Sequence, residues 1–147
     1  MPDKNLEHIE ARIAIAAEFL RKQREYLKRL DLALTIAGVG MWDWEMSSDT
    51  LTWDGRMCEL FDEPVEGIKT YNTFFDKIVP QDREMVQEAI NNALAGATYD
   101  VRYCIELSDG SRRRIHARGL LHKNGGPPTL IGVCLEINDE GHACVVE

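Results

Sequence analysis

The side chains that could act as nucleophiles or metal ligands are widely scattered in this sequence. The four cysteines are Cys58, Cys104, Cys134 and Cys144, and no two of them form a Cys-x-x-Cys pair. Structural zinc sites need ligands at tighter spacing than this, so we expect no metal centre. In a reducing compartment the four thiols are expected to be free.

Sequence patterns that mark enzyme active sites are missing. There is no nucleophile elbow, no HExxH helix and no glycine-rich phosphate loop, because Gly38-x-Gly40 runs straight into a predicted strand. Asp43 and Glu45 share one face of that strand and alternate with tryptophans, so solvated carboxylates are expected there. We therefore predict that the protein is not an enzyme. A small α+β pocket enzyme is the alternative, and it would need a buried Asp–His or Asp–Tyr pair.

The overall charge argues against a nucleic-acid partner. The net charge is −8 at pH 7, which repels phosphate backbones. The basic run at 111–114 (Ser-Arg-Arg-Arg) is the exception and is interpreted as a solvated or ion-paired hairpin arm. The sequence has no apolar run of the ~20 residues that a membrane span needs, and its start lacks the features of a signal peptide. We expect a cytoplasmic location.

Residues 1–35 differ sharply from the rest of the chain. They contain no glycine, and no proline after Pro2, and their apolar positions repeat with heptad spacing. This pattern predicts a long amphipathic helix with coiled-coil potential that serves as a dimerisation arm. One seam contains Leu6, Ile13, Leu20, Leu27 and Leu34, and the other contains Ile9, Ala16, Gln23 and Leu30. The flanking positions carry no clear charge pairs, so the helix could instead pack its apolar stripe on its own domain.

Residues 36–139 show the mixed pattern of an α+β core. Alternating apolar residues predict strands at 41–46, 50–53, 101–107, 112–123 and 129–137. Helical segments are expected between the second and third strands, one capped by Asp54 and a longer one that begins at Pro80 and stops at Gly96. Five antiparallel strands with the helices on one face make an α+β sandwich. Residues 140–147 follow as a carboxyl-terminal tail.

Four motifs in order make the chain similar to a known family. They are Gly38-Val39-Gly40-Met41-Trp42-Asp43-Trp44 in the first strand, Val79-Pro80-Gln81-Asp82-Arg83 opening the long helix, Asp109-Gly110-Ser111 in a hairpin and Leu130-Ile131-Gly132-Val133 in the last strand. With them, the chain from about residue 30 to about residue 139 resembles a PAS domain followed by its carboxyl-terminal PAC half. It departs from the family at Arg114, where a tryptophan is usual, and at residues 136–138, where Asp-Ile-Thr is common.

The resemblance implies a sensory module of bacterial signal transduction, including two-component signalling. Such a module dimerises and relays a small-molecule or partner signal to an output kinase, cyclase or chemotaxis-type effector. The effector would lie in the same chain if this is a segment of a longer protein, and in a second protein otherwise. A ligand-free PAS dimerisation scaffold is the alternative within the family.

PAS pockets lie between the sheet and the helical middle, so the resemblance also implies which residues would surround a ligand. These residues are apolar with few polar groups, as in many small-molecule pockets. They are Trp42, Trp44, Phe61, Phe74, Phe75, Ile78, Val86, Ile90, Tyr103, Ile105, Ile115, Ala117, Leu130 and Cys134. The alternative is that the same side chains simply fill the core.

Flavin and haem are both unexpected as cofactors. Residues 55–61 (Gly-Arg-Met-Cys-Glu-Leu-Phe) resemble the flavin-reactive cysteine motif of LOV photoreceptors, but they lie earlier in the fold than that motif does. The polar residues that hold flavin in that family correspond to Ile105, Ile115 and Cys134. Haem needs a histidine that faces the pocket, whereas His116 is expected on the opposite face of the sheet. The identity of any cofactor therefore stays unknown.

The outer face of the sheet is predicted to join the helical arm in a homodimer. Ile131, Val133 and Leu135 fall on that face, and an apolar surface of this kind needs a cover.

The connection between the last two strands predicts one further contact. A two-residue Asn-Gly turn at 124–125 would place Arg113 directly opposite Glu136. We predict a cross-strand ion pair between these two side chains that fixes how the last strand leaves the domain.

Overall fold

The amino-terminal part of the computed structural model is one uninterrupted helix, α1 (Lys4–Ala37). The model describes residues 3–123, 125–138 and 144, and the chain divides into two compact units, residues 1–37 and 38–147. No residue of α1 is buried. The long amino-terminal helix expected from the heptad spacing is therefore confirmed. Among the described residues, no helix has the length and apolar character needed to cross a membrane.

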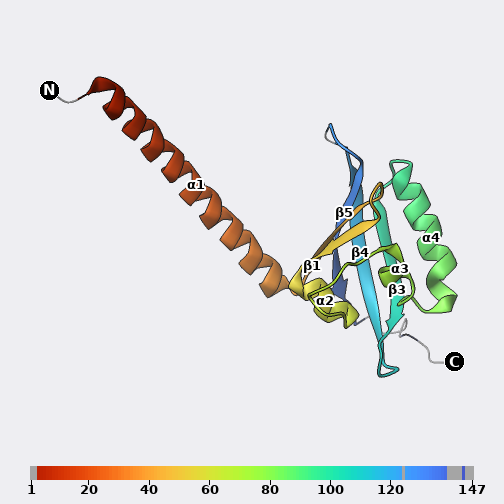
Figure 1. Ribbon diagram of the computed structural model, residues 1–147. Helices are drawn as coiled ribbons and strands as arrows, with labels where there is room; N and C mark the ends of the chain where they lie inside the picture. Colours follow the sequence, from red (N-terminus) through yellow and green to blue (C-terminus); the bar gives the residue numbers. More distant parts are fainter. Residues whose placement is uncertain (1–2, 124, 139–143, 145–147) are drawn as a thin grey trace. The chain divides into compact units, whose positions relative to one another are not determined.

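The second unit is built on an antiparallel sheet of five strands (Figure 1). In chain order the strands are β1 (Gly40–Glu45), β2 (Thr50–Trp53), β3 (Tyr99–Glu106), β4 (Arg112–His122) and β5 (Thr129–Glu136). Their spatial order is β2-β1-β5-β4-β3, so the first and last strands of the unit pair at its centre. This arrangement confirms the expected five-stranded antiparallel sheet.

Three helices fill the chain between β2 and β3, and local signals in the sequence start each of them. In α2 (Gly55–Phe61), the Asp54 carboxylate accepts from the Met57 N–H at 2.9 Å. In α3 (Tyr71–Phe75), a capping box closes the first turn. In α4 (Pro80–Leu94), proline occupies the first turn, where its missing N–H costs nothing.

Alternation along the strands separates a buried inner face from a more exposed outer face. In β3, every second residue from Tyr99 to Ile105 is buried beneath the helices, whereas Asp100, Arg102 and Glu106 are exposed. Cys104 breaks this pattern, because it lies on the outer side and is nevertheless only 5% exposed. Some other part of the chain must cover it.

Two glycines facing each other across β4 and β5 make room for an indole ring. Gly119 pairs with Gly132, and the Trp42 side chain lies over both. A Cβ at Gly119 would come within 3.1 Å of the indole, and one at Gly132 would also collide with the Arg118 carbonyl oxygen. These glycines therefore seat Trp42 in a fixed place on the inner face.

The predicted two-residue turn between β4 and β5 is wrong. The ladder ends at the His122–Thr129 pair, so the register differs from the predicted one by two residues. Pro127 and Pro128 explain the difference, because a proline has no N–H to donate to a ladder. Asn124, on which that turn was predicted, lies outside the described residues.

The new register also removes the predicted contact between Arg113 and Glu136. The residue opposite Glu136 is Ile115. Arg113 instead donates from Nη1 to the carbonyl oxygens of Glu59 and Leu60, at 2.7 Å in each case. Arg113 therefore braces the end of α2 against the sheet, and no ion pair joins it to Glu136 in the described part of the chain.

Candidate functional site

An apolar cavity of about 40 Å³ lies between the inner face of the sheet and the helices. On this scale, one water molecule needs roughly 10–15 Å³, so the cavity can hold a few waters or one small molecule. The lining residues come from both sheet and helices and are largely aromatic: Trp42, Trp44, Leu51, Trp53, Met57, Tyr71, Phe74, Ile90, Tyr99, Tyr103, Ala117, Leu130 and Cys134.

Part of the ligand set expected from the sequence surrounds this cavity. The expected residues on its wall are Trp42, Trp44, Phe74, Ile90, Tyr103, Ala117, Leu130 and Cys134. Phe61, Ile78, Val86, Ile105 and Ile115 are instead fully buried in the hydrophobic core, and Phe75 packs against that core from α3. Whether any of these residues contacts a ligand stays a prediction.

Five lining residues were missed, although the sequence contained a signal for three of them. Leu51 and Trp53 pair with Trp44 and Trp42 across the β1–β2 hairpin, so they share the inner face. Tyr99 extends the β3 alternation by one step beyond its predicted start. The other two are Met57 and Tyr71, which depend on where α2 and α3 dock against the sheet.

The rim of the cavity is held by the turn between β1 and β2. Asp49, in a left-handed conformation with φ of 49°, accepts hydrogen bonds at 3.0 Å from both the Trp44 indole and the Tyr71 backbone N–H. Tyr71 also donates its hydroxyl to Gln87 on α4, with the oxygens 2.5 Å apart. The aromatic rings of Trp44 and Tyr71 lie 5.3 Å apart. One carboxylate thus holds the Trp44 side chain and the Tyr71 backbone together at the rim.

Two donors on the cavity wall lack ordinary hydrogen-bond partners. Within the described residues, neither the Trp42 indole nitrogen nor the Tyr103 hydroxyl makes a hydrogen bond, although both atoms are buried. Burial is also the main cause that raises the pKa of Tyr103 and of Tyr99. A buried polar group without a partner costs free energy, so such groups usually have a bridging water or ligand.

The Cys134 thiol lies beside these two donors. Burial raises its pKa to about 12, while the Tyr103 hydroxyl and the Trp42 indole act in the opposite direction. The thiol is therefore neutral at physiological pH. Because sulfur is a weak acceptor, Cys134 does not take the place of a proper hydrogen-bond partner for either donor.

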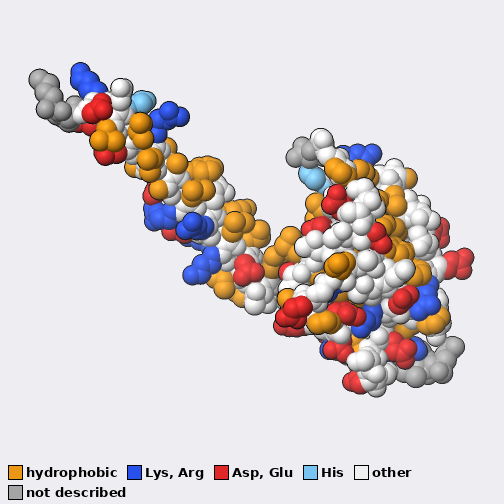
Figure 2. Space-filling view, in the orientation of Figure 1, with side chains coloured by type: hydrophobic (Ala, Val, Ile, Leu, Met, Phe, Trp, Pro, Cys, Tyr) orange, Lys and Arg blue, Asp and Glu red, His pale blue; other side chains and the backbone are white. Residues whose placement is uncertain are grey.

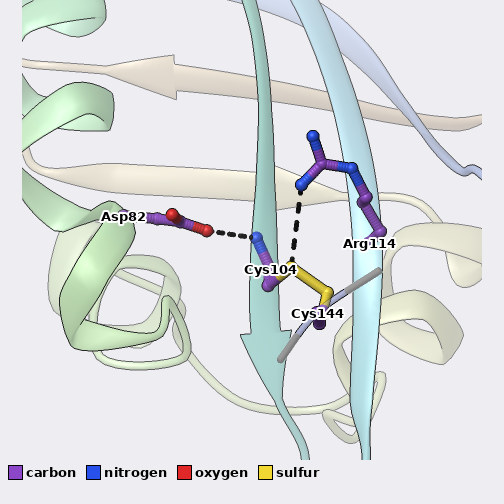
Figure 3. The surroundings of a disulfide bond; sticks show 4 residues. All are labelled: Asp82, Cys104, Arg114 and Cys144. Carbon is purple, nitrogen blue, oxygen red and sulfur yellow. Dashed lines mark hydrogen bonds between the residues drawn. A yellow bond between two sulfur atoms is a disulfide. The ribbon is translucent and has the colours of Figure 1, made fainter. Parts of the chain in front are cut away.

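A disulfide bond joins Cys104 to Cys144, so the expectation of four free thiols is wrong (Figure 3). The two cysteines are 40 residues apart in the sequence. The Cys104 N–H donates to the Asp82 carboxylate at 2.8 Å, and Arg114 Nη1 lies 3.8 Å from the Cys104 sulfur. The remaining two cysteines, Cys58 and Cys134, are free and buried. Within the described residues there is no cluster suited to a metal ion.

The outer face of the sheet carries a mixed surface. Ile131, Val133 and Leu135 are half-buried on it, as expected from their alternation in β5. Beside them, the Asp100 carboxylate lies 2.7 Å from His116 Nε2 and 3.5 Å from Arg118 Nε. His116 therefore points away from the cavity, on the face that the sequence predicted.

The seam residues of α1 are exposed except for Leu34, which is half-buried. Figure 2 shows hydrophobic side chains gathered along one side of this helix. Leu6, Ile9, Ile13, Leu20, Leu27 and Leu30 are each at least 43% exposed, and Ala16 and Gln23 are exposed as well. The interface predicted from these residues stays a prediction.

The chain matches known proteins over the sheet-and-helix unit. The PAS fold family matches residues 50–134. The probable diguanylate cyclase DgcE of Escherichia coli (strain K12) is 26% identical over 118 residues, which are 79% of this chain and 11% of that protein. Sensor protein FixL of Bradyrhizobium diazoefficiens is 29% identical over 106 residues, which are 70% of this chain and 21% of that protein.

A solved structure supports the same assignment. A sensory box histidine kinase/response regulator from Burkholderia thailandensis superposes with a TM-score of 0.64 at 25% identity, covering 76% of this chain and 86% of that one. The fold of the sheet-and-helix unit is thus shared with a sensory box histidine kinase/response regulator. The chain belongs to the PAS fold family. It spans only 11% and 21% of the length of the two signalling relatives.

Proposed function

We propose that this chain is the sensory and dimerising segment of a cytoplasmic signalling protein and that it performs no catalysis of its own. The observation that carries the proposal is the heptad stripe of apolar residues on α1, a helix that forms a compact unit of its own. All its leucine and isoleucine seam residues except Leu34 are exposed, and exposed apolar stripes of this length normally mark an interface. A second copy of the same helix offers the same spacing and would cover the stripe in register.

The outer face of the sheet supports the same assignment. Ile131, Val133 and Leu135 form a half-buried apolar row there, flanked by the polar group of Asp100, His116 and Arg118. Apolar centres with polar rims are typical of protein interfaces. In the proposed dimer this row contributes contacts in addition to those of α1.

The proposed output is a kinase or cyclase. The relatives include a diguanylate cyclase and a sensor histidine kinase/response regulator, and the matched parts are sensor domains rather than catalytic ones. A pocket enzyme is disfavoured because the described cavity lining contains no carboxylate and no histidine. A ligand-free scaffold stays the alternative, and it would dimerise in the same way without responding to small molecules.

Sedimentation velocity on a seam variant tests the dimer. Leu20→Asp combined with Leu27→Asp places charges on the seam of both copies, and we expect dimerisation to weaken by at least about 100-fold. The matched control is Ile15→Asp combined with Leu32→Asp, which makes the same chemical change at exposed positions of α1 outside the seam.

The control pair should leave the dimer nearly unchanged. Circular dichroism should show α1 still helical in both variants. Equal loss in the two variants would mean that α1 does not pair along the predicted seam. A wild-type protein that stays monomeric at 100 µM would overturn the dimer altogether.

A further inference from the structure

We propose that the inner cavity binds a small neutral molecule with a carbonyl-type acceptor, whose oxygen receives the Trp42 and Tyr103 hydrogens. This proposal rests on the sensory function proposed above and specifies the ligand class for that function. Three observations about the cavity wall carry it: the unpaired donors, the missing charge and the arrangement of the aromatic rings.

The two unpaired groups are both donors. The Trp42 indole nitrogen can only donate, and within the described residues the Tyr103 hydroxyl makes no hydrogen bond and has only the weakly accepting Cys134 sulfur beside it. Trp42 is 9% exposed and Tyr103 is 0% exposed, so bulk water does not satisfy either group. One acceptor oxygen between the two donors would give each of them a hydrogen bond. A ligand with a carbonyl group supplies such an oxygen, and a hydrocarbon does not.

Among the described residues that form the wall, none carries an ionised side chain. Its titratable members are tyrosines and Cys134, and burial keeps them neutral. A charged ligand would lose its hydration without gaining a counter-charge, which is strongly unfavourable. This requirement excludes carboxylates, phosphates and amines.

The aromatic rings set the shape and fix the donors. Trp42 meets Tyr99 edge to face at 5.8 Å, and Phe74 meets Tyr103 in the same way at 6.0 Å. The Gly119–Gly132 pair seats the indole from below. The donors are therefore held in place before a ligand enters, and the remaining space of about 40 Å³ favours a compact molecule.

Three matched probes test the proposal by nuclear magnetic resonance. Cyclopentanone carries the acceptor, methylenecyclopentane has the same shape without it, and cyclopentylammonium has a charge in its place. We expect cyclopentanone to shift the Trp42 indole resonance and to bind about tenfold more tightly than methylenecyclopentane. Cyclopentylammonium should not bind.

Donor variants identify the contacts. In Tyr103→Phe and in Trp42→Phe the preference for the ketone should fall to about one- to threefold. Leu60→Met, a volume-conserving change at a core residue of α2 that does not line the cavity, is the matched control and should keep the tenfold preference. A preference that survives both donor variants would overturn the proposal, as would binding of the ammonium probe or no binding of cyclopentanone at 50 mM. The dimer is measured separately, by sedimentation velocity. A protein that dimerises but binds none of the probes would therefore point to the scaffold alternative.

A second inference comes independently from the outer side of β3. The geometry points to Cys104 and Cys144 as a thiol–disulfide exchange site that reacts with dithiols. In cytoplasmic proteins a disulfide is usually transient or redox-sensing rather than a permanent link. The proposed location and the observed bond are therefore compatible if the bond opens and closes.

The surroundings of the disulfide suit such an exchange. Cys144 is half-buried and lines a surface hollow together with Arg56, Arg112 and Arg113. An attacking thiolate can therefore reach the Cys144 sulfur, with Cys104 as the leaving group. The guanidinium of Arg114, 3.8 Å from the Cys104 sulfur, would stabilise the thiolate that leaves (Figure 3).

The exchange is balanced as follows. One thiolate of the dithiol attacks the Cys144 sulfur, the Cys104–Cys144 bond breaks, and a mixed disulfide forms. The second thiol of the reagent then displaces Cys144, so the reagent becomes a disulfide and the two cysteines take up two protons. Two electrons pass from the dithiol to the protein, and the reverse reaction needs a disulfide as oxidant.

Alkylation and mass spectrometry test this site in the folded protein. After treatment with 1 mM dithiothreitol we expect Cys104 and Cys144 to be alkylated while Cys58 and Cys134 stay protected. Removing the reductant and adding oxidised glutathione should restore the original bond. Arg114→Gln should slow reduction several-fold, and Arg114→Lys should largely rescue the rate. A bond that resists 10 mM dithiothreitol in the folded state would overturn the exchange, as would labelling of all four cysteines at equal rates.

Discussion

The two faces of the same sheet differ in how completely they are closed. On the inner face, Trp42, Tyr103 and Cys134 are less than a tenth exposed and surround a small space. On the outer face, Met41 is 39% exposed and Leu120 is 58% exposed. A closed wall with fixed donors suits a small molecule, whereas an open apolar row with charged neighbours suits a protein surface. Because side chains alternate between the faces, the same strands supply one set of residues to the cavity and another set to the outer surface.

The largest expected effect is on stability, and it comes from adding a methyl group beneath Trp42 on the inner face. Gly132→Ala would drive a methyl group into the Trp42 indole and the Arg118 carbonyl oxygen. We expect a loss of about 3 kcal/mol in the free energy of unfolding, measured by urea denaturation. Gly126→Ala is the control, because no atom of the described residues lies within 4 Å of a Cβ there, and it should change stability by less than about 0.5 kcal/mol. Similar values for the two variants would mean that Trp42 is not seated on the glycines.

The next effect concerns the outer face. Val133→Lys would put a charge into the apolar row beside Arg118, its partner across the strands. We expect dimerisation to weaken about tenfold in sedimentation experiments, because a buried interface centre tolerates charge poorly. Thr50→Lys on the edge strand adds the same charge at an exposed position and should have little effect. An unchanged dimer in Val133→Lys would confine the interface to α1.

A smaller effect is expected at the rim of the inner cavity. Asp49→Ala removes the acceptor for both the Trp44 indole and the Tyr71 N–H. The loss should be about 1–2 kcal/mol of stability, and access to the cavity should increase. Acrylamide quenching of tryptophan fluorescence measures that access. Asp49→Asn keeps an acceptor oxygen and tolerates the left-handed backbone, so its quenching should stay close to that of the wild type.

The smallest effect is a pH dependence on the outer face. The hydrogen bond to His116 is the main cause that lowers the pKa of Asp100 in the folded protein. A lowered folded-state pKa means that the stabilisation is present above the unfolded aspartate pKa of about 3.9 and disappears as the pH falls through the folded value. Urea denaturation from pH 6 to pH 3 should therefore show the advantage over Asp100→Asn shrinking at the acid end. A constant difference would contradict the contact.

Much of this fold could be predicted from the sequence because its signals are local. Asp54 before α2 and Pro80 at the start of α4 act within one helical turn, and the alternation in β3 follows from the pleat. The β4–β5 register could not be predicted as reliably, since Asn124-Gly125 and Pro127-Pro128 favour different ends of the ladder. The ladder ends before the prolines because a residue without an N–H cannot donate a hydrogen bond inside it.

The candidate site was less accessible from the sequence. The tryptophans and Cys134 could be assigned to the inner face. That the Trp42 indole nitrogen and the Tyr103 hydroxyl find no partner among the described residues depends on the three-dimensional arrangement, which the sequence does not show. The disulfide was missed for a related reason. Cys104 and Cys144 are far apart in the sequence, and a free-thiol expectation based on compartment says nothing about which sulfur atoms meet.

The disulfide has a consequence for the unfolded chain as well. Its 40-residue separation encloses all of β4 and β5, two of the five strands of the sheet. Closing a loop of this length reduces the conformational entropy of the denatured ensemble, which corresponds to about 4 kcal/mol at 25 °C in the chain-entropy model. That is a large share of the 5–15 kcal/mol that typically holds a domain folded. Whether this one bond is oxidised or reduced therefore changes the free energy of unfolding of the whole sheet.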